Sequence, residues 1–161
     1  DLFTSPEPLI PTSGAKIMSL ADPTKKMSKS DENENAVVRI LDDRDTVIRK
    51  FRRAVTDSDS EVRRGEGKEG VGNLMTIYSC VTGKSDAEIE REFDGRGYAD
   101  FKLAVGEAVA DRLAPVREEY ARLLADKGYL EEVMNKGASE AAYYARKTLT
   151  KVRRKLGFVT L

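Results

Sequence analysis

Apolar side chains recur every three to four residues in several parts of the chain, which is the spacing of one face of an α-helix. The first such face consists of Val47, Ile48, Phe51 and Val55. Asp42 and Asp43 precede it and can accept hydrogen bonds from the free N–H groups of a helix N-terminus. The pattern therefore predicts a helix that follows residue 43 and ends near residues 56–58.

The middle of the chain alternates between irregular and helical stretches. Residues 57–72 are charged and glycine-rich without periodicity, so they predict an exposed, mobile loop. Residues 73–81 predict a short apolar helix that ends at residues 82–84. The segment from Ser85 to Glu88 fits a capping box and predicts another short helix through about Phe93.

Two long helical stripes follow. The first consists of Phe101, Val105, Val109, Leu113, Val116, Tyr120 and Leu124. Pro115 should kink this helix or remove one of its backbone bonds, and Gly128 should end it. The second stripe consists of Leu130, Val133, Met134, Gly137, Ala138, Ala141, Ala145, Leu149, Val152 and Leu156. The small residues in its middle would let a partner helix approach closely.

Residues 1–30 differ from the rest because they hold most of the prolines together with several Ser and Thr. Proline removes backbone donors, so this stretch predicts loops rather than long regular elements. Residues 17–20 could form one short strand or turn between Gly14 and Pro23. The predicted fold is therefore mainly α, a helical bundle preceded by an irregular N-terminal flap.

Composition narrows the possible classes of protein. The 161 residues can build one ordinary domain, and 35% of them are charged, which suits helices with solvated faces. Lys plus Arg and Asp plus Glu both number 28, so the formal net charge is zero. That balance excludes a uniformly cationic coat for nucleic acid but allows a local basic patch.

The rarest residue types exclude several chemistries. The chain has one cysteine, Cys80, and no histidine, so an internal disulfide, a Ser-His-Asp triad and His-metal sites are unavailable. We expect Cys80 to be a buried small hydrophobic residue, in a protein of the reducing cytoplasm. No membrane span or signal peptide is visible, and a start at Asp1 instead of Met suggests a fragment.

The string that carries chemistry is Lys26-Met27-Ser28-Lys29-Ser30. With Lys25 it packs three ammonium groups and two hydroxyls into six residues, which can surround a polyphosphate. Cations at that place would stabilise the charge that develops when pyrophosphate leaves. The alternative is a lysine-rich loop that is merely solvated.

The order of these residues resembles the second signature motif of class I aminoacyl-tRNA synthetases. Further segments are similar to bacterial tryptophanyl-tRNA synthetases in sequence and order: residues 14–20, 22–24, 54–58, 70–74, 77–79, 97–98, 101–102 and 113–117. The resemblance runs from about residue 8 to the end of the chain. These downstream segments favour the tryptophan enzymes over the tyrosine enzymes.

The resemblance implies a C-terminal part of a cytoplasmic, homodimeric enzyme without a membrane segment. Residues 1–30 would be the edge of a Rossmann-type catalytic domain with the lysine loop, and residues 31–161 a helical domain that reads the tRNA anticodon. The whole enzyme would activate tryptophan with ATP, accompanied by Mg²⁺, and transfer it to tRNA(Trp). The first signature motif of the family, which contains histidine, is absent, so we expect this chain alone to be inactive.

The resemblance also assigns roles to individual residues. Lys26 and Lys29 would stabilise the ATP phosphates, while Met27, Ser28 and Ser30 would shape the loop and contact nucleotide. Ile17 would contact ATP through its backbone; read without the resemblance, it is an ordinary core isoleucine. Lys25 would be an accessory charge.

The C-terminal helix offers a second candidate surface. Its bases are Arg146, Lys147, Lys151, Arg153, Arg154 and Lys155, with no acid between residues 141 and 161. They could contact tRNA phosphates or simply complement the helix dipole. Tyr143 and Tyr144 could stack on an unpaired base or serve in packing. We expect Arg52, Arg53, Arg63 and Arg64 to be solvated.

Two rival functions follow from the same residues. One is a class I synthetase of the tyrosine type. The other is a non-catalytic helical module for RNA or protein that retains the lysine loop.

Overall fold

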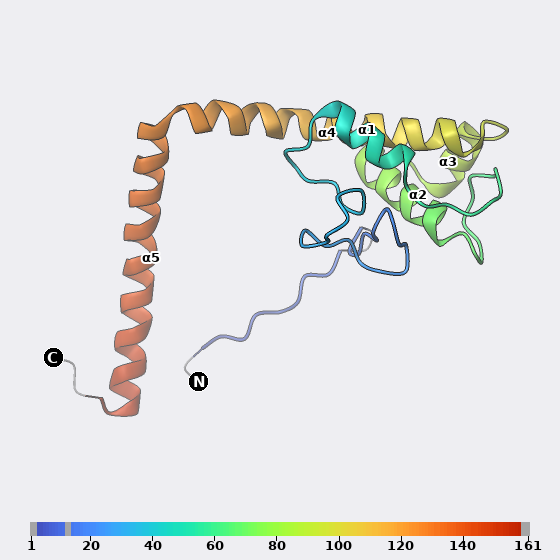
Figure 1. The fold of residues 1–161 in the computed structure, drawn as a ribbon. Helices are drawn as coiled ribbons and strands as arrows, with labels where there is room; N and C mark the ends of the chain where they lie inside the picture. Colours follow the sequence, from blue (N-terminus) through green and yellow to red (C-terminus); the bar gives the residue numbers. More distant parts are fainter. Residues whose placement is uncertain (1–2, 12–13, 159–161) are drawn as a thin grey trace. The chain divides into compact units, whose positions relative to one another are not determined.

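The computed structural model describes residues 3–11 and 14–158, and Figure 1 traces them as a mainly helical chain. The helices are α1 (Arg44–Arg52), α2 (Glu69–Thr82), α3 (Asp86–Glu92), α4 (Gly97–Ala125) and α5 (Lys127–Leu156). Within these described residues there is no strand, only an isolated antiparallel bridge between Met18 and Lys26. The mainly α prediction is confirmed.

The chain forms two compact units, residues 10–118 and residues 1–9 with 119–161. The first holds the hydrophobic core, where helices α1 to α4 bury side chains such as Val47, Phe51, Leu74 and Val105. Phe93 and Phe101 pack edge to face with ring centroids 4.9 Å apart, and Tyr78 joins both rings at 5.8 and 6.0 Å. Ile17, Leu20 and Met27 also pack against this core.

Helix α1 confirms part of its predicted face. Asp43 caps it by accepting a hydrogen bond from the Thr46 N–H at 2.7 Å, and Val47 and Phe51 are buried. The helix ends at Arg52, however, and Val55 is 47% exposed while Ala54 is buried. The prediction for Val55 is wrong because the chain leaves the helix early and Val55 donates its N–H to the Leu20 carbonyl at 2.8 Å.

Helix α2 begins at Glu69, earlier than residue 73, so the prediction of a loop through residue 72 is wrong there. The charged residue before it, Lys68, is only 8% exposed because it finds partners inside the fold. The predicted end is confirmed: Gly83 takes a left-handed conformation with φ 78° after Thr82. The capping box between Ser85 and Glu88 at the start of α3 is confirmed as well.

Helix α4 runs through Pro115 to Ala125, and Gly128 does not end it. Asp126 separates the two long helices and caps α5 by accepting a hydrogen bond from the Tyr129 N–H at 3.0 Å. Gly128 therefore falls in the first turn of α5. Taken within its own unit, α5 has no buried residue among those described, and Val133 and Leu149 are each 48% exposed.

Two smaller findings concern the described residues. Cys80, in the last part of α2, is exposed, so the prediction that it is buried is wrong. None of the helices has the length and apolar character that a membrane span requires.

Candidate functional site

The segment before the lysine string folds back on itself as a short hairpin. The Met27 N–H donates to the Ile17 carbonyl at 2.9 Å, and the Ser19 N–H donates to the Lys25 carbonyl at 2.9 Å. These two bonds flank the bridge between Met18 and Lys26. Ile17 is thereby brought beside the lysine string although it lies nine positions before Lys26.

The tip of the hairpin is closed by Asp22. Its carboxylate accepts hydrogen bonds from the Thr24 N–H at 3.1 Å and the Thr24 hydroxyl at 2.6 Å, and it pairs with the Lys25 ammonium at 3.0 Å. The hydrogen bonds from Thr24 and then Lys25 lower the pKa of Asp22 to about 2. Lys25 is thus occupied within the hairpin, which fits the accessory role expected of it.

The lysine string begins in the hairpin and continues past it, and its two candidate lysines have no bonding partner among the described residues. Lys26 and Lys29 are exposed and have no hydrogen bond or ion pair with any described residue. Met27 lies between them, half-buried and packed against the core. The Ser28 hydroxyl accepts from the Ser30 N–H at 3.3 Å, and the Ser28 carbonyl accepts from the Asp31 N–H at 3.2 Å, which closes a turn. The loop therefore holds its backbone and offers its ammonium groups to solvent.

Ile17 contributes both its side chain and its backbone to this part of the fold. Its side chain is half-buried and packs against the core, while its carbonyl is engaged by Met27. The structure places its backbone within the hairpin that carries the lysines.

The hairpin is attached to other parts of the unit of residues 10–118 at three points. The side-chain amide of Asn73 bonds both backbone groups of Met18, at 2.9 Å each. Leu20 donates its N–H to the Ala36 carbonyl at 3.0 Å and accepts at its own carbonyl from Val55. The side chain of Leu20 is buried in the core. The lysines are therefore carried by a segment that the helices hold in place.

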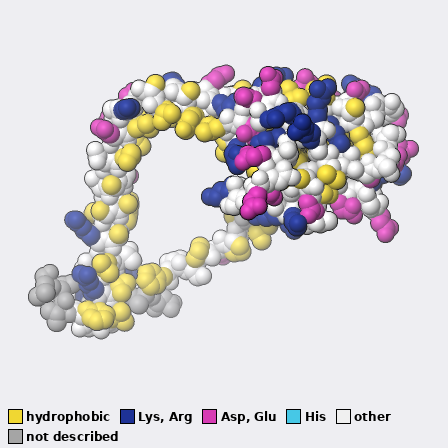
Figure 2. Space-filling model, viewed as in Figure 1, with side chains coloured by type: hydrophobic (Ala, Val, Ile, Leu, Met, Phe, Trp, Pro, Cys, Tyr) yellow, Lys and Arg dark blue, Asp and Glu magenta, His cyan; other side chains and the backbone are white. Residues whose placement is uncertain are grey.

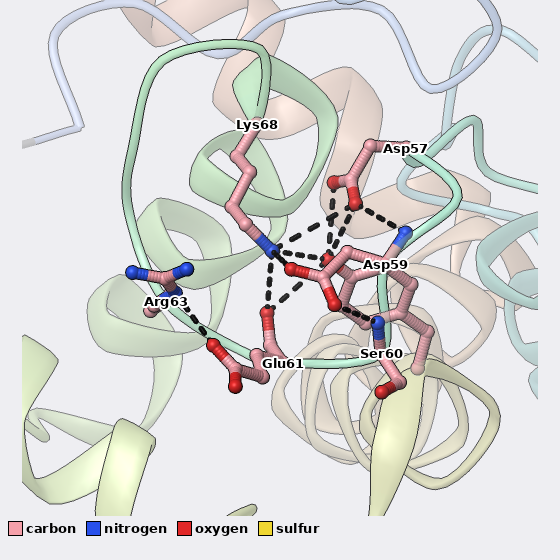
Figure 3. Close-up of polar contacts among 7 residues, drawn as sticks. Asp57, Asp59, Ser60, Glu61, Arg63 and Lys68 are labelled. Carbon is pink, nitrogen blue, oxygen red and sulfur yellow. Dashed lines mark hydrogen bonds and ion pairs between the residues drawn. The ribbon is translucent and has the colours of Figure 1, made fainter.

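A buried lysine holds the loop before α2 (Figure 3). The Lys68 ammonium donates to the Asp59 carboxylate at 2.7 Å, the Tyr98 hydroxyl at 2.8 Å and the Glu61 carbonyl at 3.0 Å. The Tyr98 hydroxyl also lies 2.8 Å from Asp57. The hydrogen bond from Lys68 lowers the pKa of Asp59 to about 2. The pKa of Lys68 is raised, mainly by its hydrogen bond to Asp59 and then by its hydrogen bond to Tyr98. Residues 57–68 are accordingly tied to α4 rather than free.

Arg64 is partly solvated, as predicted, but it is also bonded. Its guanidinium contacts the Asp86 carboxylate at 2.6 Å, the Gly72 carbonyl at 3.0 Å and the Thr76 hydroxyl at 3.0 Å. Arg52 and Arg53 are exposed, as expected.

The second candidate surface lies on α5. A hollow on this helix is lined by Tyr143, Arg146 and Lys147 with Ser139, Ala142 and Thr150. Tyr143 and Tyr144 contact each other edge to face at 5.4 Å and are 62% and 67% exposed, so neither is buried. Tyr120 and Leu124 of the same unit are 47% and 54% exposed. Figure 2 shows hydrophobic side chains at the surface of the long helices. The surface thus joins cations, aromatic rings and apolar groups.

The sequence does not single out Asn73 and Lys68, the buried polar residues that bond the hairpin and the loop before α2. Asn73 stands in a segment similar to the family, and Lys68 is one charge of a glycine-rich stretch. A signal for Asn73 was present: a polar residue among the apolar positions of residues 71–77 needs a partner once it is buried. Nothing in the sequence identified Met18 as that partner.

The family described as class I tRNA synthetases (W and Y) matches residues 1–114. The tryptophan–tRNA ligase of Wolinella succinogenes is 48% identical over 159 residues, which are 99% of this chain and 48% of that protein. The tryptophan–tRNA ligase of Clostridium acetobutylicum is 46% identical over 159 residues, again 99% of this chain and 48% of that protein. The chain spans about half the length of these relatives.

Solved structures give the same result. The tryptophanyl-tRNA synthetase from Mycoplasma pneumoniae superposes with a TM-score of 0.78 at 30% identity, covering 92% of this chain and 45% of that chain. The enzyme from Campylobacter jejuni complexed with ADP and tryptophan has a TM-score of 0.70 at 26% identity, covering 98% and 48%. These comparisons confirm the resemblance inferred from the lysine string and the later segments.

Proposed function

Because the chain belongs to the class I tRNA synthetases of the tryptophan and tyrosine group, we propose that it is the C-terminal part of a tryptophan–tRNA ligase. The whole enzyme activates tryptophan with ATP, releases pyrophosphate and transfers the amino acid to tRNA(Trp). Relatives named tryptophan–tRNA ligase, at 46–48% identity across the chain, support tryptophan over tyrosine.

One observation carries the proposal for this chain: Lys26 and Lys29 are exposed and unpaired among the described residues, yet sit on an anchored hairpin. Ammonium groups with no internal partner are available to phosphate oxygens. As the α–β linkage of ATP breaks, charge grows on the leaving pyrophosphate. Cations held at that place stabilise the transition state more than the bound substrate.

The remaining residues of the site have supporting roles. Met27 anchors the loop through its packing, and the turn from Ser28 to Asp31 exposes the Ser30 hydroxyl to nucleotide. Ile17 lies against the loop and contacts ATP through its backbone. Mg²⁺ enters with ATP and is held mainly by phosphate oxygens, as is usual for this ion. The described residues bring together no group of three metal-binding side chains.

We further propose the division of labour that the family implies. Residues 1–30 complete the edge of the Rossmann-type catalytic domain, and residues 31–161 form the helical anticodon-binding domain of a cytoplasmic homodimer. The cations and the tyrosine of the hollow on α5 support a contact with RNA, because cations attract phosphates and unpaired bases stack on an aromatic ring.

The experiment is amino-acid-dependent exchange of pyrophosphate into ATP by the full-length protein. Exchange that requires tryptophan supports the proposal, and exchange that requires tyrosine contradicts it. Filter binding of this chain to tRNA(Trp) tests the helical part: binding without preference for the tryptophan anticodon would favour a general RNA-binding module.

A further inference from the structure

We propose that Asn73 of α2 is a positioning residue for the lysine loop, acting through the backbone of Met18. The inference rests on the proposed function for its kinetic consequence, but its structural part concerns this chain alone. Through Asn73, helix α2 affects the reaction, although no residue of α2 belongs to the lysine string.

The hairpin leaves both backbone groups of Met18 in need of a partner. Its two backbone bonds join Ser19 to Lys25 and Met27 to Ile17, so Met18 and Lys26 face each other as a pair without mutual hydrogen bonds. In such a pair the N–H and C=O groups point away from the partner segment. The N–H and C=O of Met18 are therefore directed out of the hairpin, and an unpaired backbone group is costly when it is removed from water.

Asn73 satisfies both groups with one side chain. Its Oδ1 accepts from the Met18 N–H at 2.9 Å, and its Nδ2 donates to the Met18 carbonyl at 2.9 Å. Asn73 is 6% exposed and Met18 is half-buried, so these bonds are partly shielded from solvent. A side-chain amide has an acceptor and donors side by side, whereas an ionised carboxylate only accepts and an alkyl group does neither. The geometry therefore requires an amide of this length.

Asn73 is carried by a part of α2 that makes further contacts with the loop before the helix. It lies one turn into α2, whose first residue follows the buried Lys68 and its hydrogen bonds to Asp59 and Tyr98 (Figure 3). Gly70, in the same turn, lies directly against the Val55 backbone. The chain of contacts runs from α2 to Asn73, to Met18, and across the bridge to Lys26.

Loss of the Asn73 amide would free the hairpin at Met18 while leaving both lysines in the chain. Their ammonium groups could still attract ATP, because attraction of a flexible charge needs little geometry. Stabilisation of the leaving pyrophosphate needs the charge at a defined place. The variant should therefore lose turnover more than affinity for ATP.

The first measurement is backbone amide exchange on this chain. Asn73→Ala should speed exchange at Met18 and Met27 by about tenfold or more relative to amides in α4. Ile89→Val is the control, because it perturbs the core from α3 and Ile89 makes no hydrogen bond to the described residues of the hairpin. Unchanged exchange at both amides, or equal acceleration in the control, overturns the proposal.

The second measurement is pyrophosphate exchange by the full-length enzyme carrying the same variants. Asn73→Ala should lower kcat by about tenfold, with KM for ATP changing less than about threefold. Asn73→Asp should also lower kcat, because an ionised carboxylate accepts from the Met18 N–H but cannot donate to the Met18 carbonyl. Asn73→Asp preserves shape, so it keeps the test available if Asn73→Ala does not fold.

The results separate this inference from the proposed function. If the wild-type full-length protein shows no tryptophan-dependent pyrophosphate exchange, the proposed function fails. Amide exchange on this chain still tests whether Asn73 holds the backbone of Met18. If the wild type is active and the variants speed amide exchange at Met18 without lowering kcat, or if Asn73→Asp keeps the wild-type kcat, the positioning role is overturned.

Discussion

Gly70 lies so close to Val55 that a Cβ atom at residue 70 would stand 2.2 Å from the Val55 carbonyl oxygen. Val55 in turn donates its N–H to Leu20, the residue that leads into the hairpin. The contact therefore joins the first turn of α2 to the segment that carries the lysines. It also explains why a glycine is the second residue of this helix despite its low helix propensity.

Substitution of Gly70 should show how tightly this contact is packed. Gly70→Ala forces the backbone of Val55 or of α2 to move, and we expect a loss of about 1–3 kcal/mol in the free energy of unfolding. Gly72→Ala is the matched control in the same helix, since its Cβ would meet only the Arg64 guanidinium at 3.5 Å. Urea unfolding followed by circular dichroism measures both. Equal stability of the two variants would contradict the close approach.

Removal of one loop lysine should affect the chemical step. In the full-length enzyme, Lys29→Ala should slow adenylate formation by about 10²-fold, with a smaller effect on ATP affinity, because the charge acts on the departing pyrophosphate. Lys25→Ala should cost several-fold less, since Lys25 is already paired with Asp22. Single-turnover kinetics with varied ATP separates rate from affinity. Equal losses of rate and affinity for Lys29→Ala would mean that the lysine binds substrate and transition state alike.

Because of the ion pair between Asp59 and Lys68, the free energy of unfolding should depend on pH in the acidic range. The folded pKa of Asp59 is lowered to about 2, below its ordinary value of about 3.9. A group with a lowered folded pKa contributes its stability above the unfolded pKa and loses it as pH falls through the folded one. The wild-type free energy of unfolding should therefore drop between about pH 4 and about pH 2, and Asp59→Asn should drop less over that interval.

The control for this pH dependence is Asp94→Asn. Asp94 is exposed and makes no hydrogen bond or ion pair with the described residues, so its variant should follow the wild-type curve. Urea midpoints at a series of pH values provide the comparison. A curve for Asp59→Asn that parallels the wild type would exclude the ion pair as a source of acid sensitivity.

The hollow on α5 should contribute to RNA affinity through charge. Arg146→Ala with Lys147→Ala should weaken binding of tRNA(Trp), and the slope of log affinity against log salt should fall in magnitude by about one to two. Lys127→Ala, at the opposite end of the same helix, should change neither quantity to that extent. Filter-binding titrations at several salt concentrations measure the slope. An unchanged slope in the double variant would place the RNA contact elsewhere.

Local patterns in the sequence determined most of the helices and the identity of the lysine string. The capping box at Ser85 and the cap at Asp43 are recognisable because each involves residues three positions apart. The string from Lys26 to Ser30 is equally local, since its chemistry lies in the residue types and their order. The two caps were predicted correctly from the residues alone, and the family resemblance that the string carries is confirmed.

Tertiary structure decided what those local elements touch. The clamp of Asn73 on Met18 joins residues 55 positions apart, and no periodicity encodes such a pair. A charged residue in a glycine-rich stretch predicts solvent, and only the converging groups of Asp59, Glu61 and Tyr98 allow Lys68 to be buried. Burial and hydrogen bonding depend on the path of the whole chain, so the place of the lysines became visible only in the folded protein.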